Sequence, residues 1–221
     1  MFKYLETIYN IKDKPITEYP EKLISYLVQK YQIKKTDRLL DIGCGRGDFL
    51  NSFSKICLNV SGVDFSDFAK NFFPNLSITK VDLESSPIPF PDESFDIVFS
   101  KSFIEHLHYP EKVLNEIYRI LKPGGRVISM CPAWEYNIKN YYEDFTHRTP
   151  FTLISISDFH ATNGFKNVKS EYFIQLPYVW DSSFKKNLIF IVRLFLPDFL
   201  KKKFKFVRFS REIMLLSSGV K

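Results

Sequence analysis

The sequence predicts an α/β fold with one mostly parallel, seven-stranded sheet and helices on both faces. Short apolar runs that suit strands alternate with stretches of helical period along the chain. The length of 221 residues suits one domain rather than two. With 45% hydrophobic and 17% aromatic residues, the chain can bury a sizeable core.

Helices are predicted where apolar residues recur at helical spacing. In Tyr19–Tyr31 the residues Leu23 and Leu27 lie on one face, and a proline suits the first turn. The stretch 109–121 has the same pattern and stops at K-P-G-G, which predicts a helix end. Helical or loop stretches are expected at 48–55 and 67–73, and a further helix is expected at 151–163.

Seven apolar runs predict the strands of the sheet. They are Arg38–Ile42, 59–65, 77–82, 95–100, 126–132, 167–174 and 211–219. The second strand is expected to end in Asp64 and the third in Asp82. Because the carboxyl ends of parallel strands share one edge, these acids are expected to line a common crevice with Asp41.

The positive charge of the chain is concentrated in one late segment. Residues 184–211 hold nine Lys or Arg and one acid, Asp198, for a net charge of +8. The whole chain carries +6, so the remainder carries −2. This distribution argues against a general nucleic-acid surface, and we expect no nucleic-acid partner.

The cysteines and the apolar segments indicate the cellular compartment. Cys44, Cys57 and Cys131 are odd in number and widely spaced, which fits neither a disulfide framework nor a metal-ligand pattern. The polar residues 1–14 do not form a signal peptide, and no run reaches the roughly 18 apolar residues of a membrane span. We therefore expect a cytoplasmic protein.

The stretch L-L-D-I-G-C-G-R-G-D-F, residues 39–49, carries three alternating glycines, Gly43, Gly45 and Gly47. A triphosphate loop needs Lys and then Ser or Thr after its last glycine, and a dinucleotide loop needs a further glycine where Asp48 stands. The acids Asp41 and Asp48 disfavour a pyrophosphate and suit a ligand with positive charge. A tight turn without a ligand is the alternative.

Two later acids extend this ligand prediction. Asp64 follows the loop by about 20 residues, where an acid can bind both hydroxyls of a ribose. Asp82 is placed to meet an adenine amino group. The predicted ligand therefore has an adenosine, no phosphates and a cationic part.

Five segments in this order and spacing resemble the class I S-adenosylmethionine-dependent methyltransferases, in the methyltransferase type 11 subgroup that includes ubiquinone-type enzymes. The segments are L-L-D-I-G-C-G-R-G-D-F, G-V-D-F-S, V-D-L-E-S-S-P-I-P-F-P-D-E-S-F-D-I-V-F-S, F-I-E-H-L and L-N-E-I-Y-R-I-L-K-P-G-G-R-V-I, within 38–132. The resemblance implies a Rossmann-like fold, S-adenosylmethionine as cofactor and S-adenosylhomocysteine as product.

The resemblance also implies a set of cofactor-binding residues. Asp41 and the glycine-loop backbone would hold the aminoacyl end, Asp64 the ribose, and Asp82 the adenine edge. Phe65 would pack beside the adenine, and Ser100 would lie near the methionine part. The full set is Asp41, Gly43, Cys44, Gly45, Gly47, Asp64, Phe65, Asp82, Leu83 and Ser100.

Within a single domain spanning 1–221, the resemblance divides the chain by role. We expect an N-terminal helical cap at 1–37 and a cofactor-binding core at 38–132. An acceptor-side loop and helix follow at 133–165. A basic amphipathic insertion at 176–210 precedes the last strand.

Candidate catalytic residues lie beyond the fourth strand, on the side where acceptors bind in this fold. His106 and His147 have rings suited to proton transfer near neutral pH, and Glu105 or Asp144 is expected to orient His147. The alternative is that E-H-L only shapes the start of a helix.

A metal site is the other option for this region. Glu105, His106 and His147 include oxygen and nitrogen ligands. The small-RNA 2′-O-methyltransferases resemble it through E-x-x-E-H, but Ser102 stands where the first Glu would be. We therefore expect no metal.

Two further segments bear on the acceptor. The aromatic stretch 134–142 predicts a lid or acceptor wall, or else a surface loop packed on the core. The basic segment 184–211 predicts first a cover for the active site. Its second option is contact with the inner, anionic membrane face, and its third is a phosphate-bearing substrate.

The predicted function is methyl transfer from S-adenosylmethionine to an oxygen atom of a small-molecule or glycan acceptor. Surface-polysaccharide biosynthesis is the favoured context, because D-x-T-H-x-x-P-F-T resembles methyltransferases of such pathways. An RNA methyltransferase is the enzymatic alternative, disfavoured by the charge of −2 and by Ser102. A non-catalytic S-adenosylmethionine-binding protein is the other alternative.

Overall fold

The computed structural model describes residues 15–196, 200 and 203–221, so residues 1–14 of the predicted cap lie outside the described residues. Its elements in chain order are α2 (Tyr19–Tyr31), β1 (Arg38–Ile42), α3 (Asp48–Ser54), β2 (Asn59–Asp64), η1 (Phe68–Asn71), β3 (Ile78–Lys80), β4 (Phe95–Lys101), η2 (Ile104–His106), α4 (Pro110–Ile120), β5 (Leu121–Pro132), α5 (Trp134–Asn137), η3 (Tyr141–Glu143), α6 (Leu153–Thr162), β6 (Lys166–Phe173), η4 (Pro177–Val179), α7 (Ser183–Phe195), α8 (Lys205–Arg211) and β7 (Met214–Val220).

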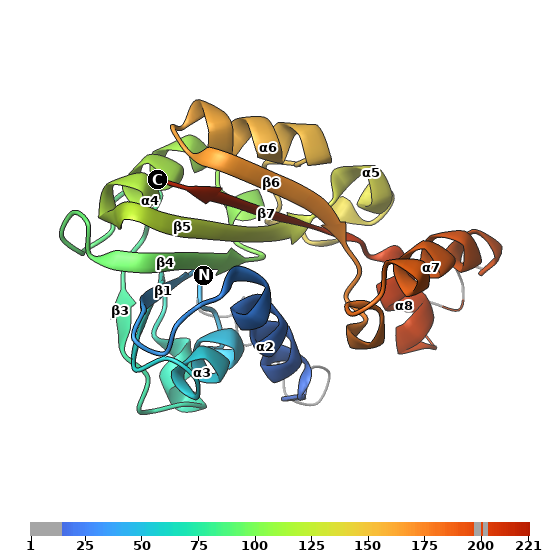
Figure 1. The fold of residues 1–221 in the computed structure, drawn as a ribbon, viewed down its shortest axis with the longest axis horizontal. Coiled ribbons are helices and arrows are strands. Elements are labelled where there is room, and N and C mark those ends of the chain that lie inside the picture. The colour runs from blue at the N-terminus through green and yellow to red at the C-terminus, as the bar shows by residue number, and fades with distance from the viewer. Residues whose placement is uncertain (1–14, 197–199, 201–202) are drawn as a thin grey trace.

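The strands of the described residues form one seven-stranded sheet in the order β3-β2-β1-β4-β5-β7-β6 (Figure 1). The pairs among β1 to β5 are parallel, whereas β7 runs antiparallel between β5 and β6. The predicted mostly parallel α/β sheet is confirmed.

Helices cover both faces of the sheet (Figure 1). Helix α2 buries Leu23, Ile24 and Leu27 in a cluster with residues of β1, β4 and β5. Helix α4 buries Val113 and Ile117 in a second cluster on the other face. The two apolar helix faces are those that the sequence pattern predicted, because residues three and four apart share one side of a helix.

Two predicted strand boundaries were wrong. Helix α4 ends at Ile120, directly before K-P-G-G as predicted, but β5 begins at Leu121 and not at 126, so K-P-G-G is part of the strand. Backbone hydrogen bonds to the last residue hold this stretch in the sheet: Gly124 N donates to Lys221 O, and Lys221 N donates to Gly125 O. Strand β3 spans only Ile78–Lys80 rather than 77–82, and the stretch 67–73, expected as helix or loop, contains one 3₁₀ turn.

In its described residues, the predicted basic insertion contains the 3₁₀ turn η4 and two α-helices, α7 and α8. Both extend past the end of the sheet at which β5 stops and β7 begins (Figure 1). The last strand therefore starts at Met214 rather than at 211, because Arg211 belongs to α8. Within the described part of the chain, no helix is both long and apolar enough to cross a membrane.

Candidate functional site

Asp41 and Ser100 place two unsatisfied polar atoms at the carboxyl ends of adjacent strands. Ile42 of β1 pairs with Ser100 of β4. Asp41 Oδ2 and Ser100 Oγ are buried and have no hydrogen-bond partner in the described chain. Burial, and after it the charge of Asp64, raises the pKa of Asp41. A buried acceptor without a partner marks a place for a ligand donor, and a cationic group fits this one best.

The glycine loop is tied to β2 and to Asp64. The backbone N–H groups of Gly43 and Cys44 both donate to Val63 O, at 2.8 and 3.3 Å. Gly45 N donates to Asp64 Oδ2 at 2.9 Å. These bonds hold Asp64 beside the loop, so the predicted loop and the predicted ribose ligand do lie together.

Gly43 also makes room for an aromatic ring. It has φ +70°, and a Cβ on it would lie 2.4 Å from Cδ2 of Phe103. Glycine is therefore required here both for its backbone conformation and for the approach of the ring. Phe103 was not among the predicted site residues, although its position two residues after β4 is a signal that points to it.

The remaining predicted cofactor residues lie in three different settings. Asp82 is exposed in the turn after β3, and its Oδ1 accepts a hydrogen bond from Glu84 N at 3.0 Å. The prediction that the third strand ends in Asp82 was wrong by two residues. Leu83 is buried in the core, and Phe65 is half-buried. Cys44 is buried, and burial raises the pKa of its thiol, which fits a packing role.

A second group, Glu105, His106 and His147, forms a compact cluster. Each residue offers one ligand atom, and the three atoms lie within 4.8 Å of one another. The backbone N–H groups of Arg148 and Thr149 donate to Glu105 O at 2.7 and 3.1 Å. These bonds bring the loop after η3 onto η2, and so join histidines 41 positions apart in the chain. We call these three residues the Glu-His-His cluster.

The hydrogen bonds of both histidines define their tautomers. His147 Nδ1 lies 2.6 Å from Tyr141 O, and a carbonyl can only accept, so Nδ1 carries the proton. His106 Nδ1 lies 2.9 Å from Thr146 Oγ1, which itself donates to Asp144 Oδ1 at 2.6 Å. Each ring therefore keeps a lone pair on Nε2.

These contacts differ from the expected orienting pairs. Asp144 was expected to orient His147, but the structure places it behind His106, with Thr146 between them. Tyr141 O, a backbone atom, orients His147 instead. The sequence analysis missed Thr146, although the D-x-T-H spacing contains it.

Glu105 is a deeply buried carboxyl group. It is 1% exposed, and neither side-chain oxygen has a hydrogen-bond partner in the described chain. Burial raises its pKa to about 8 and the charge of Asp144 adds to this, whereas the neighbouring backbone N–H groups of Glu105 and Phe103 and the charge of Lys101 lower it. Burial also lowers the pKa of His106 to about 4, with a further contribution from His147. At pH 7 His106 is therefore neutral.

Aromatic residues of the stretch 134–142 pack beside His147. The Tyr141 ring lies 4.5 Å from the His147 ring and 5.1 Å from Trp134, as centroid distances. Tyr141 is buried and donates its hydroxyl to Thr149 O at 2.7 Å, whereas Tyr142 is exposed. Tyr141 thus supports the Glu-His-His cluster, and Tyr142 is available to solvent.

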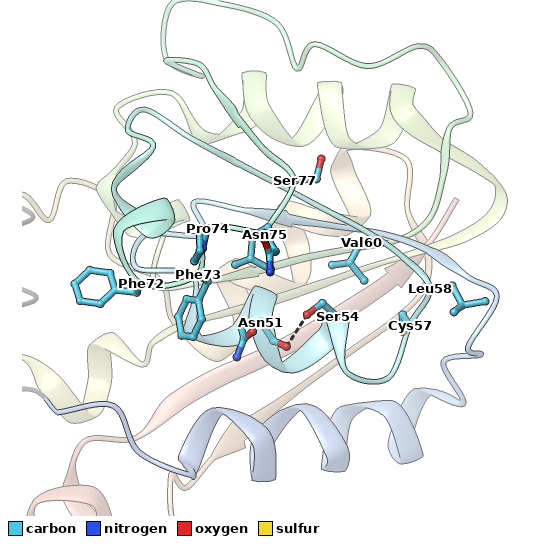
Figure 2. Close-up of a pocket in the computed structure, with 11 residues that line it drawn as sticks. Asn51, Ser54, Cys57, Leu58, Val60, Phe72, Phe73, Pro74, Asn75 and Ser77 are labelled. Atoms are coloured by element: carbon cyan, nitrogen blue, oxygen red, sulfur yellow. Dashed lines mark hydrogen bonds between the residues drawn. The ribbon is translucent and has the colours of Figure 1, made fainter.

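A separate depression lies among α3, the start of β2 and the segment 72–77 (Figure 2). Its lining residues are Asn51, Ser54, Cys57, Leu58, Val60, Phe72, Phe73, Pro74, Asn75, Leu76 and Ser77. None of them is charged, and Leu58 and Val60 lie at the start of β2, whereas Asp64 ends it. We therefore assign the chemistry to the strand ends and not to this depression.

Comparisons with known proteins agree with this geometry. A family described as "Methyltransferase domain" matches residues 40–129. An uncharacterized protein of Methanocaldococcus jannaschii is 34% identical over 186 residues, which cover 81% of this chain and 76% of that protein. The ubiquinone/menaquinone biosynthesis C-methyltransferase of Pseudoalteromonas translucida is 30% identical over 107 residues, 43% of each chain. The chain thus spans less than half the length of that enzyme.

The fold comparison points the same way. The crystal structure of a SAM-dependent methyltransferase from Archaeoglobus fulgidus matches with a TM-score of 0.65 and 23% identity, over 91% of this chain and 94% of that one. Asp41 and Ser100 have side-chain oxygens without hydrogen-bond partners at the strand ends. They fit a cationic cofactor that has an amino group, such as S-adenosylmethionine. The chain belongs to the class I S-adenosylmethionine-dependent methyltransferases.

Proposed function

We propose that this methyltransferase methylates a hydroxyl group on a sugar or other small-molecule acceptor. The observation that supports this proposal best is the Glu-His-His cluster. Two imidazoles with free Nε2 lone pairs lie beside a buried carboxyl group, just past the end of β4. An oxygen nucleophile gains most from such a cluster, because its proton must leave as the new bond forms.

We assign the cofactor to the strand ends around the glycine loop. Asp41 accepts a hydrogen bond from its amino group. Asp64 accepts hydrogen bonds from its ribose hydroxyls on the lone pairs that Gly45 N and Ser66 N do not use. Ser100 Oγ lies beside the methionine part, and Phe65, Asp82 and Leu83 lie beside the adenine. When bound, S-adenosylmethionine supplies an electrophilic methyl group on a sulfonium.

His147 is the group that we propose as general base. Its ring is fixed by the hydrogen bond from Nδ1 to Tyr141 O, so Nε2 can accept the proton of the acceptor hydroxyl. Proton transfer of this kind contributes roughly 10²–10⁴-fold to a rate. His106 and Glu105 bound the same space, and alignment of the acceptor there contributes through proximity and orientation.

The acceptor that we propose is presented at a membrane surface. Helix α7 exposes Phe184, Leu188, Ile191 and Phe195, which are spaced as one helical stripe. These side chains are 76%, 46%, 56% and 80% exposed. The opposite side of α7 faces the protein through the buried Ile189. A helix that turns its apolar stripe to solvent is suited to insertion at a lipid interface.

The charge around this stripe selects an anionic lipid surface. The segment 184–211 carries +8, and Lys203, Lys205 and Arg208 are exposed in or just before α8, the helix that contacts α7. Each cation near an anionic leaflet contributes about 1 kcal/mol of attraction. A lipid-linked glycan of surface-polysaccharide biosynthesis combines both requirements, a hydroxyl acceptor and an anionic membrane anchor.

The relatives suggest the main alternative to a hydroxyl acceptor. The matched ubiquinone/menaquinone enzyme is named a C-methyltransferase, so a carbon acceptor on a membrane quinone is the second candidate. Both candidates use the same membrane surface. They differ at the atom that receives the methyl group. Methylation of a sugar hydroxyl gives a methyl ether that survives acid hydrolysis, whereas methylation of a quinone carbon gives none.

The experiment supplies the protein with methyl-labelled S-adenosylmethionine and vesicles that carry a lipid-linked oligosaccharide, a demethyl quinone precursor, or neither. Total RNA serves as a further acceptor. We expect label in the oligosaccharide, recovered after acid hydrolysis as an O-methyl sugar. Label in the quinone or the RNA would overturn the proposal, and no label with any acceptor would favour a non-catalytic role.

The matched variants test the base. We expect His147→Gln to lower kcat by about 10²-fold and to leave S-adenosylhomocysteine affinity unchanged. His108→Gln is the control, because His108 is exposed and paired with Glu84, outside the Glu-His-His cluster. Equal activity of the two variants would remove His147 as the base.

A further inference from the structure

We propose that Glu105, His106 and His147 bind a divalent transition-metal ion, with Zn²⁺ as the representative ion. The inference deepens the proposed acceptor site and rests on it for the ion's role, but ion binding itself is independent of the acceptor. Three ligand atoms within 4.8 Å of one another come from two separate segments of the chain. Two imidazoles and one carboxylate are a ligand set that zinc and related ions take in proteins.

Both histidines have the hydrogen bonds that metal-ligating histidines make. Such residues donate the second ring N–H to a carbonyl, a carboxylate or a polar relay, which fixes the ring and directs the other nitrogen to the ion. His147 donates from Nδ1 to Tyr141 O at 2.6 Å. His106 donates from Nδ1 to Thr146 Oγ1, which continues to Asp144 Oδ1. Both Nε2 atoms are thereby left as ligands.

Glu105 provides the independent second observation. Its side chain is 1% exposed, and both carboxyl oxygens are buried without a hydrogen-bond partner among the described residues. Burial of such a group costs free energy unless a partner compensates it. A cation held at the Glu-His-His cluster supplies that partner.

The distances require only a small adjustment. Bonds of about 2.0–2.2 Å place two ligands of one ion roughly 3.0–3.6 Å apart at tetrahedral or octahedral angles. The three ligand atoms lie within 4.8 Å of one another, so they must approach by roughly 1–2 Å to bind one ion. The backbone bonds from Arg148 and Thr149 to Glu105 O already hold the two segments together.

The serine at position 102 is not an argument against this metal site. The expectation of no metal rests on Ser102, which stands where a fourth ligand, a Glu carboxylate, would be. Ser102 is exposed, and its Oγ lies 3.5 Å from Lys101 Nζ, so it is no part of the cluster. Three protein ligands are enough for a catalytic ion, because the open position binds water or substrate.

The open position is where the acceptor oxygen would bind. Coordination lowers the pKa of a hydroxyl, so its proton leaves to solvent. The oxygen lone pair then forms the C–O bond to the methyl group, and the electrons of the broken C–S bond stay on sulfur. In this form the two histidines act as ligands, and the direct proton transfer to His147 is replaced.

The test measures metal binding directly, on untagged protein without acceptor. The protein is treated with a chelator, titrated with Zn²⁺ and with Co²⁺ by calorimetry, and its metal content is determined after dialysis. We expect one ion per chain, and at least tenfold weaker binding in Glu105→Gln and in His147→Gln. His108→Gln, which alters the exposed His108–Glu84 pair, is expected to bind like the wild type.

The outcomes separate this inference from the proposed function. S-adenosylhomocysteine binding by each variant confirms that it is folded. Absence of a stoichiometric ion in the wild type, or equal loss in His108→Gln, would overturn the metal site. Hydroxyl methylation that persists in chelator-treated protein would then leave His147 as the direct base, whereas a carbon or RNA product would overturn the proposed function while leaving ion binding intact.

Discussion

Asp41 and Asp64 lie on neighbouring parallel strands, and burial followed by the nearby charge of Asp64 raises the pKa of Asp41. The two carboxyl groups differ in their partners. Asp64 accepts hydrogen bonds from Gly45 N and Ser66 N, whereas Asp41 Oδ2 has none in the described chain. The negative charge of the site is therefore least compensated at Asp41, where a cationic cofactor would bind.

Asp41→Asn is expected to stabilise the cofactor-free protein while weakening cofactor binding. Because the folded-state pKa of Asp41 is raised, the unfolded state ionises first, and the wild type loses stability as pH rises above about 4. The variant lacks this loss, so its melting temperature should exceed that of the wild type at pH 7 and match it near pH 4.

The same variant should bind S-adenosylmethionine roughly 10- to 100-fold more weakly, the effect of about 1.5–3 kcal/mol from one charged hydrogen bond. Calorimetry measures the affinity and differential scanning the stability. Asp67→Asn, at an exposed acid, is the control and should change neither. A variant that is less stable than the wild type at pH 7 would contradict the electrostatic argument.

Asp64→Ala should weaken the affinity for S-adenosylhomocysteine by about 100-fold or more. The change removes the proposed ribose ligand and also the acceptor that holds Gly45 N and Ser66 N, so the glycine loop loses its anchor. Asp64→Asn keeps one oxygen and should fall between wild type and Ala. Unchanged affinity in the Ala variant would remove Asp64 from the cofactor site.

Local sequence signals were sufficient for most of the fold. Leu23 and Leu27 of α2 and Val113 of α4 follow helical spacing and are buried as expected. At K-P-G-G they predicted the helix end but not the strand, because backbone bonds to Lys221, about a hundred residues later, make this stretch part of β5. A pairing between distant segments has no local signature, so the breaker was the only visible signal.

The site was predictable to the same extent. Strand ends placed Asp41, Asp64 and Ser100 correctly at one edge of the sheet. The sequence also supplied both histidines, but not their partners. The orienting atom of His147 is a backbone carbonyl, Tyr141 O, and any residue type carries one. Such partners depend on the path of the loop, which a residue pattern does not contain.

Helix α7 offers a test of membrane contact. Replacing Ile191 and Phe195 with Glu places charge on the exposed apolar stripe without touching the buried Ile189. We expect the double variant to lose co-sedimentation with anionic vesicles by at least tenfold, while its melting temperature changes little, because both side chains are already in water.

Two controls define the surface. Gln29→Glu adds charge at an exposed site of α2 and should bind vesicles like the wild type. Lys203→Gln with Lys205→Gln should weaken binding to anionic vesicles and reduce its salt dependence. Equal sedimentation of all variants, or of the wild type with neutral and anionic vesicles, would contradict an anionic lipid surface.

His160 predicts how the stability of the sheet depends on pH. The ring is fully buried on α6, where Nδ1 donates to Ile156 O at 2.9 Å and Nε2 lies 3.1 Å from Ser129 Oγ. Burial lowers its pKa to about 4. A neutral ring satisfies these partners, whereas a protonated ring would turn a buried acceptor nitrogen into a second donor.

The unfolded chain binds the proton first, near pH 6.5, so protonation favours unfolding. The contribution of His160 to the free energy of unfolding is fully present above pH 6.5 and is lost as pH falls toward 4, on the order of 3 kcal/mol in total.

Urea unfolding at pH 7, 6 and 5 measures this loss of stability. His160→Gln should be less stable at pH 7 and should lose less stability between pH 7 and 5 than the wild type. His108→Gln, at an exposed ring outside the core, is the matched control; a slope in His160→Gln equal to that of the wild type would show that another group causes the acid sensitivity.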